Sequence, residues 1–240
     1  MSSKKRHFVA LAERLRHEHP EVPDPVAAIA AGRVVVDGVT VTNPRSLVLR
    51  HGTISISGEL LLRGTVKLRA ALVGFHISVA SRIALDVGAS TGGFTSALLE
   101  AGARRVYAVD AGHGQLLGSL RQDERVVNLE RTNLGALTPL TVTDRIDIVA
   151  VDLSYLALAE AVPQLEVMRF GSSADLIALV KPMFELRRST PPTHEADFKD
   201  AIRLATSGIE RGAWTMKGGF RSPVLGQRGA VEFLVHAQRR

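Results

Sequence analysis

From residue 81 onward the chain alternates short apolar runs with stretches of helical spacing. Runs such as RIALD, RRVYAVD, IDIVAVD and ADLIALVK are typical of strands, and SALLEAG and GQLLGSL between them are typical of helices. This alternation predicts a doubly wound α/β domain. Because the strand-like runs are apolar almost throughout, we expect helices to cover both faces of a mostly parallel sheet.

The amino-terminal part follows another pattern. Phe8, Leu11 and Leu15 have helical spacing, which predicts a helix over residues 7–17. In DPVAAIAAG, Asp24 has the position of an N-cap and Gly32 that of a stop, so a second short helix follows.

A tight hairpin is expected next, in RVVVDGVTVTN. The pair Asp37 and Gly38 separates two β-branched runs, which is a strong short-range hairpin signal. Together these patterns predict a small α+β domain over residues 1–60, followed by the α/β domain over residues 61–240.

Four of the predicted strands end at a charged residue: Asp86, Asp110, Asp152 and Lys181. A charge that only solvates a strand end is common when it stands alone. Parallel strands, however, bring their carboxyl ends to one edge of the sheet, where ligands of such folds bind. Four charges at that edge favour a polar site.

The loop after the first strand, in LDVGASTGGF, narrows the class of ligand. A P-loop would carry a lysine after its last glycine, but Phe94 follows Gly93. A dinucleotide fingerprint would have glycine where Ser90 stands, so NAD is disfavoured.

S-adenosylmethionine suits this loop better, because it has no phosphate and offers a carboxylate, an ammonium and a sulfonium. Asp86, Gly88, Ser90 and Gly92 are the candidate contacts in the first loop. Asp110, which ends the second strand, would bind both ribose hydroxyls, although NAD uses an acid there in the same way.

Composition and charge constrain the chemistry further. The 240 residues include no cysteine, which excludes disulfides and thiolate zinc sites, and the eight histidines show no paired metal spacing, so we expect no metal. We expect a soluble protein of the reducing cytoplasm without membrane association, because no apolar run is long enough for a signal peptide or a spanning helix. The net charge of +6 favours a polyanionic partner such as nucleic acid.

Two resemblances connect these observations. AAGRVVVDGVTVTNPRSLV resembles the alpha-L RNA-binding domain, with Arg33, Arg45 and Arg50 as candidate phosphate contacts; the alternative is a helix-hairpin cap with a solvated basic face. The motifs LDVGASTGGFT, VYAVDAGHGQL, LERTN, VDLSYLAL and ALVKPMFE resemble, in order and spacing, the haemolysin A (TlyA) family of ribosomal RNA ribose methyltransferases.

The resemblance to this family implies a Rossmann-like, FtsJ-like domain that uses S-adenosyl-L-methionine to methylate a cytidine ribose 2′-hydroxyl in ribosomal RNA or a ribosomal subunit. It also implies a cofactor contact at Asn133 in LERTN. By motif position, its catalytic tetrad falls on Lys67, Asp152, Lys181 and Glu232, with Lys181 as the base or hydroxyl-orienting group. Glu232 stands in an apolar pattern, so we expect a partner such as a lysine; the alternative is an acid on an edge strand that faces water.

Some residues depart from the family or leave alternatives open. His113 replaces a usual Tyr, Ala230 replaces a usual Asn, and the segment after Lys181 lacks a Gly-rich loop. Tyr155 and Phe184 are candidates for stacking on the target base or for core positions.

Trp214 is expected to pack near the last strands. Two other functions are weighed against the enzyme: a noncatalytic RNA-binding assembly protein that keeps the fold, and membrane lysis, which no amphipathic or spanning segment supports.

Overall fold

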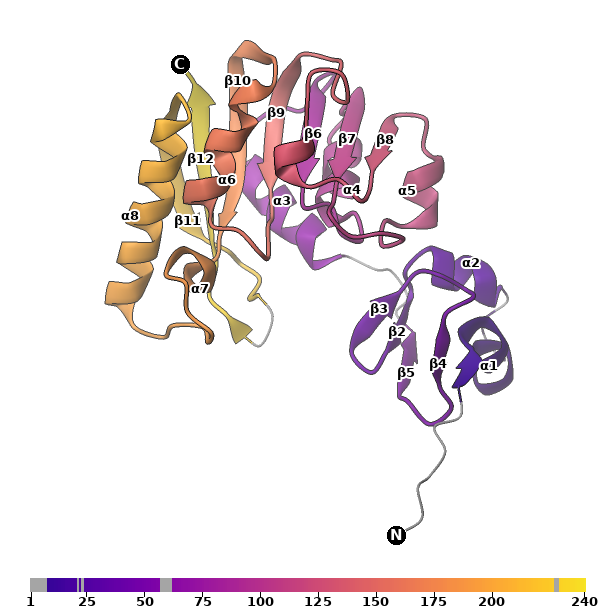
Figure 1. Ribbon diagram of the computed structural model, residues 1–240. Coiled ribbons are helices and arrows are strands. Elements are labelled where there is room, and N and C mark those ends of the chain that lie inside the picture. The colour runs from indigo at the N-terminus through magenta and orange to yellow at the C-terminus, as the bar shows by residue number, and fades with distance from the viewer. Residues whose placement is uncertain (1–7, 21, 23, 57–61, 227–228) are drawn as a thin grey trace.

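The structure is a computed structural model, and it describes residues 8–20, 22, 24–56, 62–226 and 229–240 (Figure 1). The expected domain boundary between residues 60 and 61 lies outside the described residues, as does residue 7 at the expected start of the first helix.

A seven-stranded sheet forms the centre of the larger part of the chain. In spatial order its strands are β11 (Trp214–Arg221), β12 (Phe233–Arg239), β10 (Phe170–Val180), β9 (Ile146–Val151), β6 (Ile83–Val87), β7 (Arg105–Val109) and β8 (Val126–Leu129). Neighbouring strands from β10 to β8 are parallel, while β12 is antiparallel to both β10 and β11. The predicted α/β fold with a mostly parallel sheet is therefore confirmed.

Helices cover both faces of this sheet (Figure 1). The helical elements are α3 (Arg63–Gly74), α4 (Gly93–Glu100), α5 (Gly118–Gln122), α6 (Leu158–Gln164), α7 (Pro182–Glu185) and α8 (Glu195–Arg211), with 3-10 turns η1 (Leu134–Ala136) and η2 (Leu165–Val167). The chain proceeds outward from β6 through β7 and β8 and returns at β9 beside β6. The strand order thus reverses between β6 and β9, which is where such folds bind ligands.

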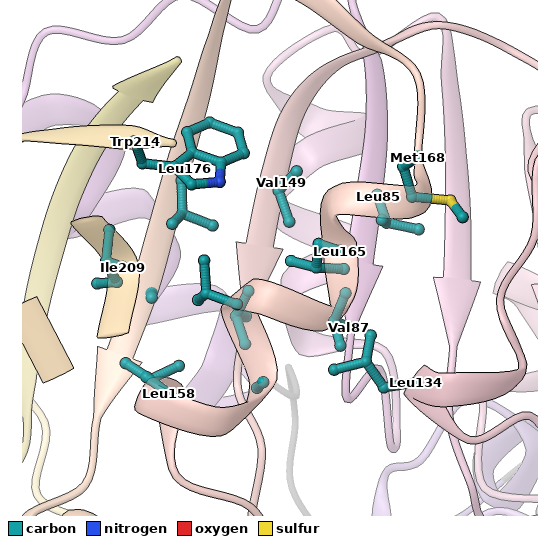
Figure 2. Packing of buried hydrophobic residues seen from close by; sticks show 14 of the residues in the cluster. Leu85, Val87, Leu134, Val149, Leu158, Leu165, Met168, Leu176, Ile209 and Trp214 are labelled. Atoms are coloured by element: carbon teal, nitrogen blue, oxygen red, sulfur yellow. The ribbon is translucent and has the colours of Figure 1, made fainter. Parts of the chain in front are cut away.

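Strand side chains alternate between two apolar clusters. Leu85 and Val87 of β6 belong to the cluster with α6 and α8, whereas Ala84 belongs to the cluster with α3 and α4. Figure 2 shows the first cluster, in which Trp214 lies beside Leu176. Trp214 is fully buried, as expected for a packing residue, and each such buried apolar side chain stabilises the fold by roughly 1.5 to 3 kcal/mol.

The amino-terminal part has a separate core. Its elements are β1 (Phe8–Ala10), α1 (Leu11–Glu18), α2 (Pro25–Ala30), β2 (Val34–Val36), β3 (Val39–Val41), β4 (Leu47–Leu49) and β5 (Ile54–Ile56). β2 pairs with β3 and β5, and β1 pairs with β4. Leu11, Leu15 and Ile29 from the two helices pack on Val34 and on further apolar residues of the strands.

The expected helix over residues 7–17 begins later than its apolar spacing suggested. Phe8–Ala10 is a strand that pairs antiparallel with β4, Phe8 opposite Leu49, and the helix starts at Leu11. This pairing joins segments about 40 residues apart in the sequence, so local periodicity could not reveal it.

The other two local predictions are confirmed. Asp24 Oδ1 accepts a hydrogen bond from Ala27 N at 2.9 Å and caps α2. Asp37 and Gly38 have φ values of 49° and 81°, which are those of a two-residue hairpin turn between β2 and β3.

Candidate functional site

A cleft of about 960 Å³ lies at the carboxyl ends of β6, β9 and β10. Its lining includes Lys67, Asp152, Lys181 and Glu232. The first loop after β6 and the segment after β10 line it as well. The amino-terminal part contributes another wall with residues 38–43 and Ser46, which carry no charged side chain.

One lysine–carboxylate pair joins two adjacent strand ends. Lys181 follows β10, Asp152 follows β9, and Lys181 Nζ lies 2.5 Å from Asp152 Oδ1. The ammonium group also donates to Ser154 Oγ at 2.7 Å. Both side chains of the ion pair keep some contact with solvent, at 14% for the lysine and 21% for the aspartate. The lysine nitrogen is thereby held at the cleft by an ion pair with a carboxylate and a hydrogen bond to a hydroxyl.

A second lysine–carboxylate pair is more deeply buried. Lys67 Nζ donates to Glu232 Oε2 at 2.5 Å, with side-chain exposures of only 8% and 5%. Lys67 lies on α3, which the apolar residues Leu68 and Ala71 anchor against the core. Glu232 directly precedes β12, so the expected lysine partner of this acid is confirmed, and the alternative of an edge acid facing water is wrong.

The loop after β6 approaches this site closely. Gly88 lies on the cleft wall with φ of +91°, and any side chain there would collide with the carbonyl oxygen of Asp152. Ser90, also on the wall, donates its amide to Asp110 Oδ2 at 2.8 Å. Asp110 Oδ1 accepts from Gly112 N at 2.6 Å, so this carboxylate joins the loops after β6 and β7.

Asp86 lies beneath the first loop and outside the cleft lining. It is fully buried, and its Oδ2 accepts from Thr95 Oγ1 at 2.6 Å. Burial raises the pKa of Asp86 to about 7, and the nearby carboxylates of Asp152 and Asp110 act in the same direction. Gly92, which also lies outside the lining, packs against Leu120 and Leu116 of the α5 region. These two residues shape the loop from below.

The remaining sequence candidates lie away from the cleft lining. Asn133 directly precedes η1 and makes no side-chain capping bond there. Arg45 and Arg50 are exposed, and Arg33 is half-buried. The structure therefore gathers Lys67, Asp152, Lys181, Glu232, Gly88 and Ser90 around one cavity and places Asp86, Gly92, Asp110, Asn133 and the three arginines outside its lining.

Several residues of this region were missed by sequence reasoning. Ser154 contacts Lys181, and its only signal was a position two residues after Asp152. Gln115 Oε1 accepts from Ser90 Oγ at 3.1 Å, while the amide of Gln115 donates to Glu130 Oε1 at 2.9 Å. These contacts fasten the loop after β7 to the first loop.

The two parts of the chain meet at that same loop. Thr42 Oγ1 lies 3.4 Å from the carbonyl oxygens of Gly114 and Gln115. A Cβ on Gly118 would lie 3.5 Å from Ala30 Cβ, which is ordinary packing distance. Sequence periodicity carried no sign of this contact.

The positions that depart from the family lie near the cleft. Ala230 lines it, as do Pro191 and Pro192 of the segment after Lys181. His113 is exposed, and its Nδ1 lies 3.6 Å from Glu130 Oε2.

The two stacking candidates differ in position. Phe184 lines the cleft, with its ring centroid 6.0 Å from Lys181 Nζ. Tyr155 is 54% exposed and is not part of the lining. Of the two, Phe184 has the position from which it could contact a molecule in the cleft.

The first loop fits the aminoacyl end of S-adenosylmethionine. Gly88 and Ser90 of this loop line the cleft, and the strand order reverses at that point. Asp110 lies at the end of the neighbouring strand, as a ribose-binding acid requires. Within the described part of the chain, no cluster of three or more His, Cys, Asp or Glu side chains could hold a metal ion. None of the helices there is long and apolar enough to cross a membrane.

Comparison with known proteins adds an independent line of evidence. Residues 61–239 match the family of FtsJ-like methyltransferases. The 16S/23S rRNA (cytidine-2′-O)-methyltransferase TlyA of Mycobacterium tuberculosis is 40% identical over 217 residues, which cover 86% of this chain and 80% of that protein.

Solved structures agree with this similarity. A hemolysin-like protein from Streptococcus thermophilus is 30% identical, with a TM-score of 0.73 over 98% of this chain and 89% of its own. The magnesium protoporphyrin IX methyltransferase of Synechocystis, solved with bound S-adenosylmethionine, is 16% identical with a TM-score of 0.51, over 75% of this chain and 81% of its own. The latter similarity shows a shared fold.

Proposed function

The chain belongs to the FtsJ-like methyltransferases and, within them, to the TlyA family, and on this basis we propose that it methylates the ribose 2′-hydroxyl of a cytidine in ribosomal RNA. The observation that carries the proposal is the meeting of two lysine–carboxylate pairs in one cleft beside the glycine-containing first loop. The donor of the methyl group is S-adenosylmethionine, the cofactor of this family.

The reaction sets a clear requirement on the cleft. A ribose hydroxyl is a weak nucleophile at neutral pH, so it must lose its proton as its oxygen forms the new bond to carbon. S-adenosylmethionine, when bound, supplies a methyl group on a sulfonium that leaves as a neutral thioether. Much of the rate must come from alignment of oxygen, carbon and sulfur in the cleft.

Lys181 is proposed to orient the hydroxyl and, as the neutral amine whose nitrogen carries a lone pair, to receive its proton. Asp152 and Ser154 contact the side-chain nitrogen, and the lone pair of the amine would face a hydroxyl in the cleft. Lys67 and Glu232 line the same cleft, and their ion pair joins α3 to the start of β12.

The proposed cofactor contacts follow from the loops around the first strand. Gly88 and Ser90 would present the backbone to the aminoacyl end, and Asp110 would bind the ribose hydroxyls of the cofactor. Asp86 and Gly92 would act by shaping the loop from beneath, and Asn133 stays a further candidate.

The amino-terminal part is proposed to bind RNA as an alpha-L domain, with a boundary near residues 60 and 61. Arg33, Arg45 and Arg50 are the proposed phosphate contacts, since such contacts position a protein on RNA without reading the sequence. An enzyme of ribosomal RNA would act in the cytoplasm, where ribosomes are.

The test is methyl transfer to ribosomal RNA. We would incubate the purified protein with methyl-labelled S-adenosylmethionine and with in vitro transcribed 16S and 23S RNA or isolated ribosomal subunits, and then map ribose methylation by resistance to alkaline cleavage. We expect label in 2′-O-methylcytidine. RNA binding without transfer to any of these substrates would favour the noncatalytic assembly protein, and label on a base would overturn the ribose assignment.

A further inference from the structure

Three basic residues line the cleft among the described residues, and their charges are not equally compensated. Lys67 is paired with Glu232, and Lys181 is paired with Asp152. Arg63, by contrast, has no carboxylate partner within the described residues. The cleft therefore has one positive side chain whose charge remains available to a ligand.

Arg63 is held in position by neutral groups. Its Nη2 donates to the carbonyl oxygens of Leu225 and Gly226, at 2.6 and 2.7 Å. The Nε and Nη1 groups donate to no described residue, and the side chain is exposed. A guanidinium group oriented in this way loses less conformational entropy when it binds an anion than a freely moving one would.

The position of Arg63 relates it to the reacting group. It precedes Lys67 by four residues on α3, so both lie on the same side of the helix, about one turn of 5.4 Å apart. In RNA, the 2′-hydroxyl and the 3′-phosphate are carried by adjacent ribose carbons. A cleft that binds the hydroxyl must therefore also accept the negative charge of that phosphate.

We propose that Arg63 binds a backbone phosphate of the RNA at the target nucleotide. This inference rests on the proposed function, because it requires RNA in the cleft. The two lysines have their charges matched by carboxylates, so Arg63 is the cleft-lining cation best suited to the phosphate. A guanidinium group also forms strong, charge-assisted hydrogen bonds with phosphate oxygens.

A purely structural role would have another signature. Arg63 tethers residues 225 and 226, and Gly226 packs so closely on Glu232 that no side chain fits between them. If Arg63 served only this segment, its replacement would alter the Lys67–Glu232 pair and thermal stability. It would leave unchanged the number of RNA phosphates that the protein neutralises.

The salt dependence of RNA binding distinguishes the two roles. We would measure the Kd of the full chain for in vitro transcribed 23S RNA, with saturating S-adenosylhomocysteine, from about 50 to 200 mM salt. Arg63→Ala is expected to weaken binding about tenfold at the lower salt and to make the slope of log K against log salt shallower by about one. Arg63→Lys should retain most of the slope because it keeps the charge.

Arg69→Ala is the matched control. Arg69 lies on the same helix, outside the cleft lining, and is paired with Glu100 in an exposed ion pair. Its removal changes the net charge by the same amount, so it corrects for general attraction to RNA. An Arg63→Ala slope equal to that of Arg69→Ala would overturn the proposal, whether or not the affinity falls.

Failure of this inference can be told from failure of the proposed function. If the unaltered protein methylates cytidine ribose but Arg63→Ala has an unchanged slope, only the phosphate contact is wrong. If the unaltered protein transfers no methyl group to 16S or 23S RNA, the proposed function itself is wrong. Cofactor affinity and thermal unfolding of each variant show that it is folded, and Arg63→Lys provides a milder replacement if Arg63→Ala is not.

Discussion

The two lysine–carboxylate pairs have the same chemical groups and the same 2.5 Å separation, yet they occupy different environments. Lys67 and Glu232 are almost completely enclosed, and Gly226 lies directly against the carboxylate of Glu232. Lys181 and Asp152 stand at strand ends that open to the cleft, with a serine hydroxyl as a third partner. Lys67–Glu232 is called the enclosed pair below, and Lys181–Asp152 the open pair. The enclosed pair favours fixed geometry, whereas the open pair can exchange a partner for substrate.

This difference assigns separate expected roles. Removal of one member of the enclosed pair leaves an uncompensated buried charge, so its main consequence is on folding. Removal of one member of the open pair leaves a charge that water can reach, so its main consequence is on chemistry. The following predictions test that division.

The largest effect is expected for Lys181→Ala. With cofactor and RNA saturating, the single-turnover rate should fall by about 10²- to 10⁴-fold, because a positioned acid-base group is lost. Binding of S-adenosylmethionine and RNA should remain near the level of the unaltered protein. Rapid-quench measurement of methyl transfer checks this, since saturation removes binding defects from the rate.

Lys199→Ala is the control for this experiment, because Lys199 is exposed on α8, away from the cleft lining. Its rate should be unchanged. If Lys181→Ala and Asp152→Ala both transfer methyl groups at the rate of Lys199→Ala, the open pair is not part of the chemistry.

The enclosed pair should reveal itself in stability. Lys67→Met and Glu232→Leu are each expected to lower the free energy of unfolding by about 3 to 5 kcal/mol, since each leaves a buried charge unpaired. The double variant should lose less than either single variant, because an apolar pair needs no compensation. Urea unfolding of the four proteins gives the coupling energy.

Arg69 and Glu100 provide the exposed comparison on the same helix. Their coupling energy in an equivalent cycle should be about 0 to 1 kcal/mol. A coupling for Lys67 and Glu232 no larger than this would show that enclosure does not distinguish the two pairs of the cleft.

Asp86 extends the comparison to a buried carboxylate that accepts from a threonine hydroxyl and, among the residues that the structure describes, has no lysine partner. Burial raises its pKa from the ordinary value of 3.8 to about 7, so the folded state holds a proton that the unfolded state has released between these values. The contribution of Asp86 to the free energy of unfolding is therefore greatest below about pH 4 and is lost as pH rises to about 7.

Asp86→Asn should remove that loss, roughly 2 to 4 kcal/mol between pH 4 and pH 7. Urea unfolding at a series of pH values checks it, with the difference between variant and unaltered protein as the measured quantity. As pH rises from 4 to 7, the free energy of unfolding of the variant should increase relative to that of the unaltered protein. A difference that stays constant from pH 4 to pH 7 would mean that Asp86 titrates alike in both states.

Much of the fold was accessible from local patterns. The apolar runs predicted the strands, and Asp24 and the Asp37-Gly38 pair predicted a cap and a turn, because these features depend on neighbouring residues alone. Phe8 was assigned to a helix because its periodicity is helical, while its actual partner, Leu49, lies far along the chain. Long-range pairing decided that element.

The site shows the same limit. Burying the carboxylate of Glu232 without a partner would cost free energy, so a lysine partner could be predicted from that residue alone. The structure contains this lysine, Lys67. The contacts of Asp110 with loop amides and of Lys181 with Ser154 depend on how separate loops meet. So does the wall of the cleft contributed by residues 38–43, to which no local pattern pointed.

The smallest of the expected effects concerns Asp110, a carboxylate that is bound by amides instead of a cation. Asp110→Ala should lower S-adenosylmethionine affinity by about 1 to 3 kcal/mol, because Ser90 N and Gly112 N lose their acceptor and the cofactor ribose loses its partner. Asp110→Asn keeps one acceptor oxygen and should retain part of the affinity. Titration calorimetry of the three proteins measures the change, with NAD as a competitor that should have no effect.

Asp123, which is paired with Arg125 beyond α5, provides the control, since Asp123→Ala removes a carboxylate outside the cleft lining. Equal cofactor affinity in Asp110→Ala and Asp123→Ala, or displacement of S-adenosylmethionine by NAD, would contradict the proposed ribose contact. At saturating cofactor the single-turnover rate of Asp110→Ala should be unchanged, which distinguishes Asp110, a binding residue, from Lys181 and Asp152 of the open pair.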